Sequence, residues 1–180
     1  MKKNLDICLR EFFENDIVPV KRLIDHTIDS SYTGVYPPNA VRFFKQFHST
    51  DRILEEAKDG NMVVLEREGN IVGTGAIIGN RVFRVFVAPR FHRKGYGKII
   101  MNSLEAKARS NGLSEIILDV SLPSIGFYKS LGYDLFEEAS IDVGDGESLD
   151  YFRARKALKK KRFLTTKSLK DGSRIFYLDK

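Results

Sequence analysis

A short basic turn with two glycines stands between a strand-like run and a helix-like run. The turn covers residues 92–98 (HRKGYGK), after the β-branched and aromatic residues 81–87 and before a helix-forming run over residues 98–109. This order brings the turn to a helix N-terminus, where unpaired backbone N–H groups and the helix dipole favour an anion. The turn therefore predicts a phosphate-binding site.

Two other phosphate-binding patterns fit this turn poorly. A dinucleotide-binding fingerprint needs a third glycine where this chain has Ile100. A P-loop needs Ser or Thr directly after its Gly-Lys pair, and here Ile99 follows Lys98. A glycine turn that only connects a strand to a helix is the alternative that involves no ligand.

A second segment with candidate chemistry covers residues 119–133 (DVSLPSIGFYKSLGY). It predicts the end of a strand, a helix that starts near Pro123, and a helix end at residues 131–133. Tyr128 lies within this helix, and a positioned tyrosine hydroxyl can donate a proton to a departing group. On helix spacing alone, a half-buried packing residue beside Phe127 fits better.

Two carboxylates on predicted strands are candidate general bases. Asp119 lies on the strand before the Tyr128 helix, and Glu66 lies on an earlier strand. A solvated or hydrogen-bonded carboxylate fits either position as well. The histidines, the cysteine and the carboxylates show no metal-ligand spacing, so no metal is expected.

The elements that must position these residues follow a mixed α/β pattern. Strands are predicted over residues 5–12, 61–67, 71–78, 81–87, 116–120, 133–143 and 149–158. Helices are predicted over residues 17–28, from residue 39 to a break at 48–51, on through residue 57, over 98–109 and after residue 123. The order predicts one domain: two or three helices, an antiparallel meander, then strand–helix–strand–helix and a terminal hairpin.

The net charge of +6 comes from the end of the chain. Residues 156–180 hold nine Lys or Arg and two Asp, which leaves 21 basic and 22 acidic side chains in residues 1–155. We therefore expect a domain over residues 1–158 and a basic extension over residues 159–180. Its runs 163–169 and 173–178 flank Asp171-Gly172, which fits either an ordered hairpin or a loose extension.

Taken together, the two segments resemble the GNAT superfamily of acyl-CoA-dependent N-acyltransferases over about residues 5–158. The family turn has Gln or Arg, two residues, Gly, one residue, then Gly or Ala, and residues 92–97 match it with His92 at the first position. In the second segment an aromatic pair precedes a Leu-Gly-aromatic ending, and Ser121 stands where many members carry Asn. The resemblance implies a mostly antiparallel sheet, splayed after residues 81–87 and flanked by helices.

The resemblance also implies an activity and a set of roles. The chain would transfer acetyl from acetyl-CoA to a primary amine by direct attack in a ternary complex. The Val87 N–H would polarise the thioester carbonyl, and Tyr128 would protonate the departing thiolate. The base stays open between Asp119, the first candidate, and Glu66. The implied coenzyme-binding residues are Phe86, Val87, His92, Arg93, Lys94, Gly95, Tyr96, Gly97, Lys98, Ser121, Ser124, Phe127 and Tyr128.

The acceptor is a small-molecule amine or a peptide amine that the sequence does not name. Variable loops usually select it, so Asp29, Tyr32 and Tyr36 in the predicted loop 29–38 are candidate contacts, although an ordinary surface loop fits as well. A catalytically inactive acyl-CoA-binding regulatory module is the alternative function. A nucleic-acid-binding tail is less favoured, because its lysines are mixed with β-forming apolar residues.

The remaining features concern the environment of the protein. The single cysteine, Cys8, cannot form an internal disulfide, and neither a secretory signal nor a membrane span is apparent, so a cytoplasmic protein is expected. Pairing of an edge strand or of the final hairpin between chains would produce a homodimer.

Overall fold

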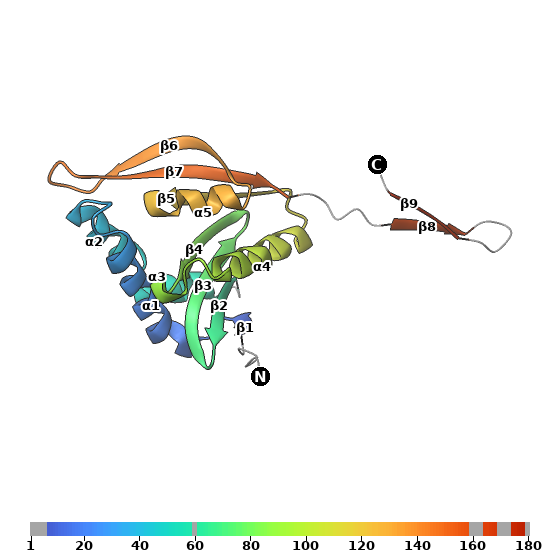
Figure 1. Ribbon diagram of the computed structural model, residues 1–180, viewed down its shortest axis with the longest axis horizontal. Coiled ribbons are helices and arrows are strands. Elements are labelled where there is room, and N and C mark those ends of the chain that lie inside the picture. The colour runs from blue at the N-terminus through green and yellow to red at the C-terminus, as the bar shows by residue number, and fades with distance from the viewer. Residues whose placement is uncertain (1–6, 59–60, 159–163, 169–173, 179–180) are drawn as a thin grey trace.

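A seven-stranded sheet forms the centre of the computed structural model, which describes residues 7–58, 61–158, 164–168 and 174–178. The strand order is β1-β2-β3-β4-β5-β7-β6 (Figure 1). The strands are β1 (Ile7–Glu11), β2 (Met62–Arg67), β3 (Asn70–Ile78), β4 (Arg81–Val87), β5 (Glu115–Ser121), β6 (Asp134–Asp142) and β7 (Ser148–Ala157). All neighbours are antiparallel except β4 and β5. The expected mixed α/β fold is confirmed.

The sheet opens between its only parallel pair of strands. β4 and β5 pair at a single position, Arg81 opposite Ile117, where the Ile117 N–H donates to the Asn80 carbonyl at 2.9 Å. Toward Val87 and Ser121 the two strands have no further ladder pairs. The expected splay after residues 81–87 is therefore present, and it leaves a gap at the carboxyl ends of both strands.

Helices cover both faces of the sheet because strand residues alternate between two apolar cores. Val63 and Leu65 of β2 pack with α4 (Tyr96–Ser110), whereas Met62 and Val64 pack with the other helices. The second group comprises α1 (Ile17–Ser31), α2 (Pro38–Phe47) and α3 (Thr50–Ala57) (Figure 1). Short 3₁₀ turns are η1 (Glu14–Asp16), η2 (Pro89–Phe91) and η3 (Leu122–Ser124), the last of which leads into α5 (Ile125–Ser130).

Two glycines of β3 allow α4 to lie close to the sheet. A Cβ at Gly75 would be 2.5 Å from Cγ2 of Ile100, and a Cβ at Gly73 would be 2.8 Å from its Cδ1. Ile100 is completely buried in this space. This close contact sets the distance between α4 and the sheet, and therefore the position of the N-terminus of α4.

Several boundaries differ from those expected. α4 begins at Tyr96 instead of residue 98, and α1 continues to Ser31, so the predicted loop 29–38 is partly helical. The extension contains an antiparallel pair, β8 (Leu164–Ser168) and β9 (Arg174–Leu178), within the two runs that fitted either an ordered hairpin or a loose extension. Its predicted turn, Asp171-Gly172, lies outside the described residues. Within the described part of the chain, no helix has the length and apolar character needed to cross a membrane.

Candidate active site

The backbone at the end of β4 faces the gap in the sheet. The Ala88 N–H donates to the Val72 carbonyl at 2.9 Å, so the alternation of an antiparallel ladder turns the N–H and C=O of Val87 away from β3. They point to the side where β5 has separated from β4. The Val87 carbonyl lies 2.7 Å from Nε2 of His92, which ties the glycine turn to the strand end.

The glycine turn has the geometry of an anion site. Gly95 caps α4 in the left-handed region (φ +84°), and Arg93 also has a positive φ of 58°. The Ile99 N–H donates to the Gly95 carbonyl at 3.1 Å, so the first-turn amides before it have no acceptor within the helix. The side chains of Arg93, Lys94 and Lys98 form no ion pair with any described residue. Tyr96, by contrast, is buried and packs against Phe91, with ring centroids 5.7 Å apart.

Phe127 and Tyr128 of α5 lie against this turn and against the cavity beside it. Phe127 packs in the same apolar core as α4 and contacts Gly97. The Tyr128 ring is edge-on to those of Phe127 and Tyr133, at 5.0 and 5.6 Å. Burial raises the pKa of the Tyr128 hydroxyl. That hydroxyl has no hydrogen-bond partner among the described residues.

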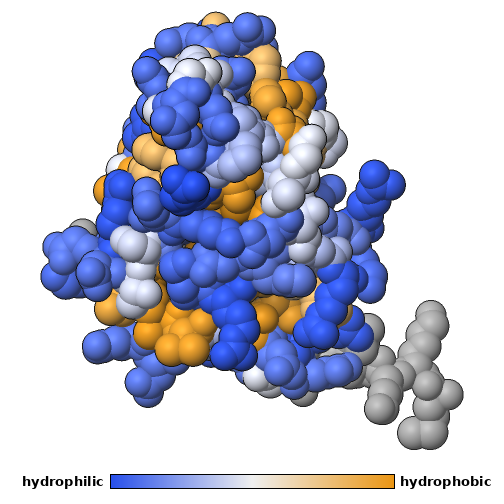
Figure 2. Space-filling model, turned by 90° about the vertical axis from the view of Figure 1, so that its left-hand side faces the viewer, coloured by the Kyte–Doolittle hydropathy of each residue, from blue (hydrophilic) through white to orange (hydrophobic). Residues whose placement is uncertain are grey.

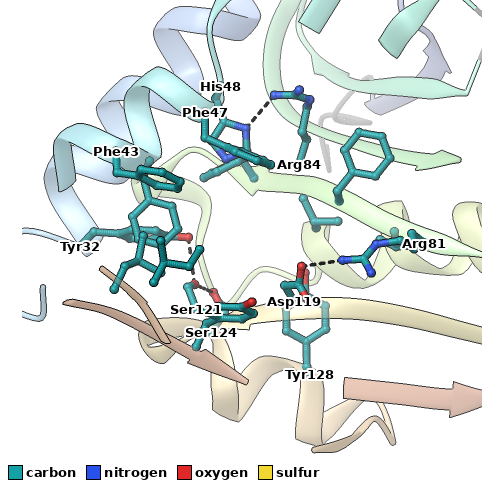
Figure 3. A pocket seen from close by; sticks show the side chains of 18 of the residues that line it. Tyr32, Phe43, Phe47, His48, Arg81, Arg84, Asp119, Ser121, Ser124 and Tyr128 are labelled. Atoms are coloured by element: carbon teal, nitrogen blue, oxygen red, sulfur yellow. Dashed lines mark hydrogen bonds and ion pairs between the residues drawn. The ribbon is translucent and has the colours of Figure 1, made fainter. Parts of the chain in front are cut away.

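A cavity of about 410 Å³ joins Tyr128 to the splayed strands (Figure 3). β4 lines it with residues 81–86, and α2, β6 and β7 add mostly apolar side chains. Asp119, Ser121 and Ser124 line it on the β5 side. The cavity therefore holds the candidate acid, one candidate base and the inner face of the β4 strand.

The two candidate bases lie in different places. Asp119 lines the cavity, where its Oδ2 accepts from the Arg81 guanidinium at 2.7 Å (Figure 3). Glu66 accepts from Arg10 at 2.9 Å and does not line the cavity. The structure brings only Asp119 into the cavity with Tyr128.

The three residues predicted to contact the acceptor also lie in different places. Tyr32 lines the cavity, and its hydroxyl lies 2.9 Å from Oγ of Ser121, which lies 2.9 Å from Oγ of Ser124. The Tyr36 hydroxyl instead donates to the Asp150 carbonyl and accepts from the Leu122 N–H, both at 2.8 Å, and burial raises its pKa to about 12. Asp29 forms an ion pair with Lys45 at 2.5 Å outside this cavity.

A buried polar cluster in the cavity was missed at the sequence level. The Arg84 side chain is fully buried; its Nε and one terminal nitrogen lie 3.0 and 2.6 Å from Glu56 Oε2, and the other lies 2.7 Å from Nδ1 of His48. Burial and the nearby cations lower the pKa of His48 to about 3. Because a guanidinium only donates, Nδ1 must accept, and the proton of neutral His48 is on Nε2.

A bulge in β4 points Arg84 into this cluster. Thr74 pairs with Phe86 and the next pair joins Ala76 to Phe83, so β4 uses three residues where β3 uses two. Arg84 lies in this extra length of β4 and has a φ of +55°. The repeat Val-Phe-Arg-Val-Phe over residues 82–86 has a period of three, which no regular strand shows. That irregular period is the signal that could have revealed the bulge.

Comparison with known proteins identifies the family. A family model described as acetyltransferase (GNAT) family matches residues 23–133, more than half of the chain. The chain belongs to this family. A curated relative, probable N-acetyltransferase 14 of Danio rerio, is 31% identical over 111 residues. The match covers 56% of this chain and only 39% of that protein.

Solved GNAT structures share the fold. A GCN5-related N-acetyltransferase from Rhodopseudomonas palustris superposes with a TM-score of 0.76 at 18% identity, over 84% of this chain and 95% of that one. YncA from Salmonella typhimurium, a putative acetyltransferase solved with its cofactor acetyl-CoA, gives 0.66 at 19% identity, over 86% and 95%. At these identities the likeness concerns the fold alone.

The two segments of this chain each depart from the family pattern at one residue, His92 in the glycine turn and Ser121 at the end of β5. His92 replaces Gln or Arg, and its ring holds the Val87 carbonyl. Ser121 replaces Asn, and its hydroxyl lies between those of Tyr32 and Ser124. No three His, Cys, Asp or Glu side chains of the described ranges come together as a metal site would require.

Proposed function

We propose that the chain is an N-acetyltransferase that transfers acetyl from acetyl-CoA to a primary amine by direct attack in a ternary complex. The proposal depends mainly on one observation: the unpartnered Tyr128 hydroxyl shares a cavity with Asp119 and with the β4 edge of the gap. Within this proposal, residues 1–158 form the acetyltransferase domain and residues 159–180 form a basic extension.

The residues around the gap fit coenzyme A. The first-turn amides of α4 and the cations Arg93, Lys94 and Lys98 would hold the pyrophosphate. Phe86 and Val87 on one side of the gap, and Ser121, Ser124, Phe127 and Tyr128 on the other, would line the pantetheine arm. YncA, which shares the fold, binds acetyl-CoA as its cofactor, and this supports the same ligand here.

The chemistry requires stabilisation of the acyl oxygen and two proton transfers. The amine nitrogen forms a bond to the acetyl carbon as the carbon–sulfur bond breaks, and the Val87 N–H, facing the gap, would stabilise the charge on the acyl oxygen. The nitrogen loses its proton to Asp119, directly or through water; Asp119 Oδ1 has no hydrogen-bond partner among the described residues. Tyr128 gives its proton to the departing sulfur. Desolvation raises the pKa of Tyr128, and it would also favour the neutral thiol over the thiolate.

A calorimetric titration tests the coenzyme half of the proposal. Wild-type protein should bind acetyl-CoA, and the triple variant Arg93→Ala/Lys94→Ala/Lys98→Ala should bind it about tenfold or more weakly, because charge-assisted phosphate contacts are lost. Lys58→Ala is the matched control, since Lys58 is exposed at the end of α3. Absence of binding by the folded wild type would refute the proposal.

A turnover assay tests the other half. Release of free thiol from acetyl-CoA is followed over a panel of primary amines. Release that depends on an added amine supports the transferase. Binding of acetyl-CoA without release on any amine would favour the inactive acyl-CoA-binding module instead.

A further inference from the structure

The walls of the cavity are largely aromatic. Phe43 and Phe47, one turn apart on α2, are stacked with centroids 6.2 Å apart and an angle of 21° between their planes. Phe83 and Phe86 of β4 and Tyr151 of β7 line the same cavity. On the side of the molecule where α2 lies, hydrophobic side chains reach the surface among polar ones (Figure 2). The Arg52 guanidinium lies over the Phe47 ring, 4.1 Å from its centroid. The wall therefore offers mainly apolar ring surface to a bound molecule, with the Phe47 ring already stacked on Phe43.

The charges in the cavity are all paired with each other. Four charged side chains line it, and they form two ion pairs: Arg84 with Glu56 at 2.6 Å, and Arg81 with Asp119 at 2.7 Å. His48 adds no charge at neutral pH because its pKa is lowered to about 3. The lining thus has neither a surplus carboxylate for a second ammonium group nor a spare cation for a carboxylate.

The proposed reacting groups and the aromatic rings of α2 lie at opposite ends of the cavity, and the buried His48 and Arg84 lie beside those rings. Figure 3 shows Asp119 and Tyr128 at one end and Phe43 and Phe47 at the other. The proposed chemistry requires the acceptor nitrogen at the Asp119 end. The rest of the acceptor then lies against the aromatic wall.

We infer that the acceptor is a small monoamine with an uncharged, ring-sized apolar body, bound with its amine near Asp119 and its body against Phe47 and Phe83. The inference rests on the proposed acetyltransferase function. A cavity of about 410 Å³ is large enough for such a molecule. Polyamines, aminoglycosides and free amino acids would bring further charges to an apolar wall, where an unpaired charge is costly.

Substrate comparison is the first test. The kcat/KM for 2-phenylethylamine should exceed that for spermidine, kanamycin and glycine by about tenfold or more, because only the first keeps the wall free of unpaired charge. A higher kcat/KM for spermidine, kanamycin or glycine, each of which carries at least one further charge, would overturn the inference.

Variants of the wall provide the second test. Phe47→Ala should lower kcat/KM for 2-phenylethylamine by about tenfold, since buried apolar contact is lost. The KM for acetyl-CoA should stay within about twofold, and Phe47→Leu should restore most of the loss. Phe136→Ala, at an exposed position of β6 outside the cavity, is the matched control. Because Phe47 is 37% exposed, the variant should fold, and its melting temperature checks this.

Direct binding separates this inference from the proposed function. Calorimetry with 2-phenylethylamine on wild type and Phe47→Ala needs no turnover. Binding that Phe47→Ala weakens, without thiol release, would support the aromatic site and overturn the acetyltransferase. Thiol release with spermidine, kanamycin or glycine, together with no binding of 2-phenylethylamine, would support the acetyltransferase and overturn the aromatic acceptor site.

Discussion

The ring of Phe127 occupies the space where a side chain at position 97 would lie. A Cβ built on Gly97 would be 2.8 Å from Cζ of Phe127 and 3.0 Å from its Cε2. Gly97 belongs to the glycine turn and Phe127 to the segment that carries Tyr128, and 30 residues separate them in the chain. The contact joins the proposed phosphate site to the proposed acid, so a change at one should affect the other.

Gly97→Ala should weaken acetyl-CoA binding and lower turnover together. The new methyl group must displace the Phe127 ring, which moves α5 relative to the N-terminus of α4. We expect a loss of about tenfold in kcat/KM, since small displacements of catalytic groups have large effects. Steady-state kinetics and calorimetry check this.

Gly126→Ala is the matched control for that variant. Gly126 lies in α5, and a Cβ there would meet nothing within 4 Å. Alanine should therefore leave binding unchanged and stabilise the helix slightly. If Gly97→Ala leaves acetyl-CoA binding and turnover unchanged, as Gly126→Ala should, the contact between Gly97 and Phe127 does not affect function.

Tyr128→Phe should lower turnover by about a hundredfold or more while acetyl-CoA affinity stays within about twofold, because only the proton donor is removed. Burial raises the pKa of Tyr128, so the hydroxyl keeps its proton throughout an ordinary assay range. The wild type should accordingly show no alkaline decline caused by Tyr128 below about pH 10. Unchanged turnover in the variant would remove Tyr128 from its proposed role.

The order of helices and strands could be predicted because its signals are local. Residues 79–80 and 144–146 mark hairpin turns, and the strand runs beside them alternate or are continuously apolar. The glycine turn was found for the same reason. Its helix starts two residues early because Gly95, in the left-handed region, is the residue that caps α4.

Side-chain destinations could not be predicted where they depend on distant partners. Tyr36 was a candidate acceptor contact, yet its hydroxyl bonds Leu122 and Asp150, 86 and 114 residues away. The period of three over residues 82–86 signals the bulge at Arg84, but it gives no sign of Glu56 on α3. Such contacts are set by tertiary packing, which periodicity does not encode.

Glu56→Gln should destabilise the protein by about 3–5 kcal/mol, because it leaves the Arg84 charge buried without a counter-charge. The substitution keeps the shape of the side chain, so the loss reports the charge. Chemical denaturation measures it. Glu137→Gln is the matched control, since Glu137 and Arg153 form their ion pair at the surface, where little should change. Equal stability of the two variants would show that Arg84 needs no carboxylate.

His48 should make the protein less stable in mild acid. Its pKa is lowered from 6.5 to about 3 in the folded state, so between these values the unfolded chain binds a proton that the native protein does not. The free energy of unfolding is therefore unaffected by His48 well above pH 6.5, and it falls as the pH drops from 6.5 toward 3. By pH 5 the loss amounts to about 2 kcal/mol relative to neutral pH.

His48→Asn isolates this effect. The asparagine carbonyl can accept from Arg84 as Nδ1 does, but it does not titrate. Denaturation from pH 5 to 8 should therefore show a shallower decline for His48→Asn than for the wild type, by about 2 kcal/mol across the range. His26→Asn, at an exposed position of α1, should follow the wild type. Parallel curves for wild type and His48→Asn would mean that His48 can take up a proton in the native state, with Arg84 turning away from Nδ1 to allow it.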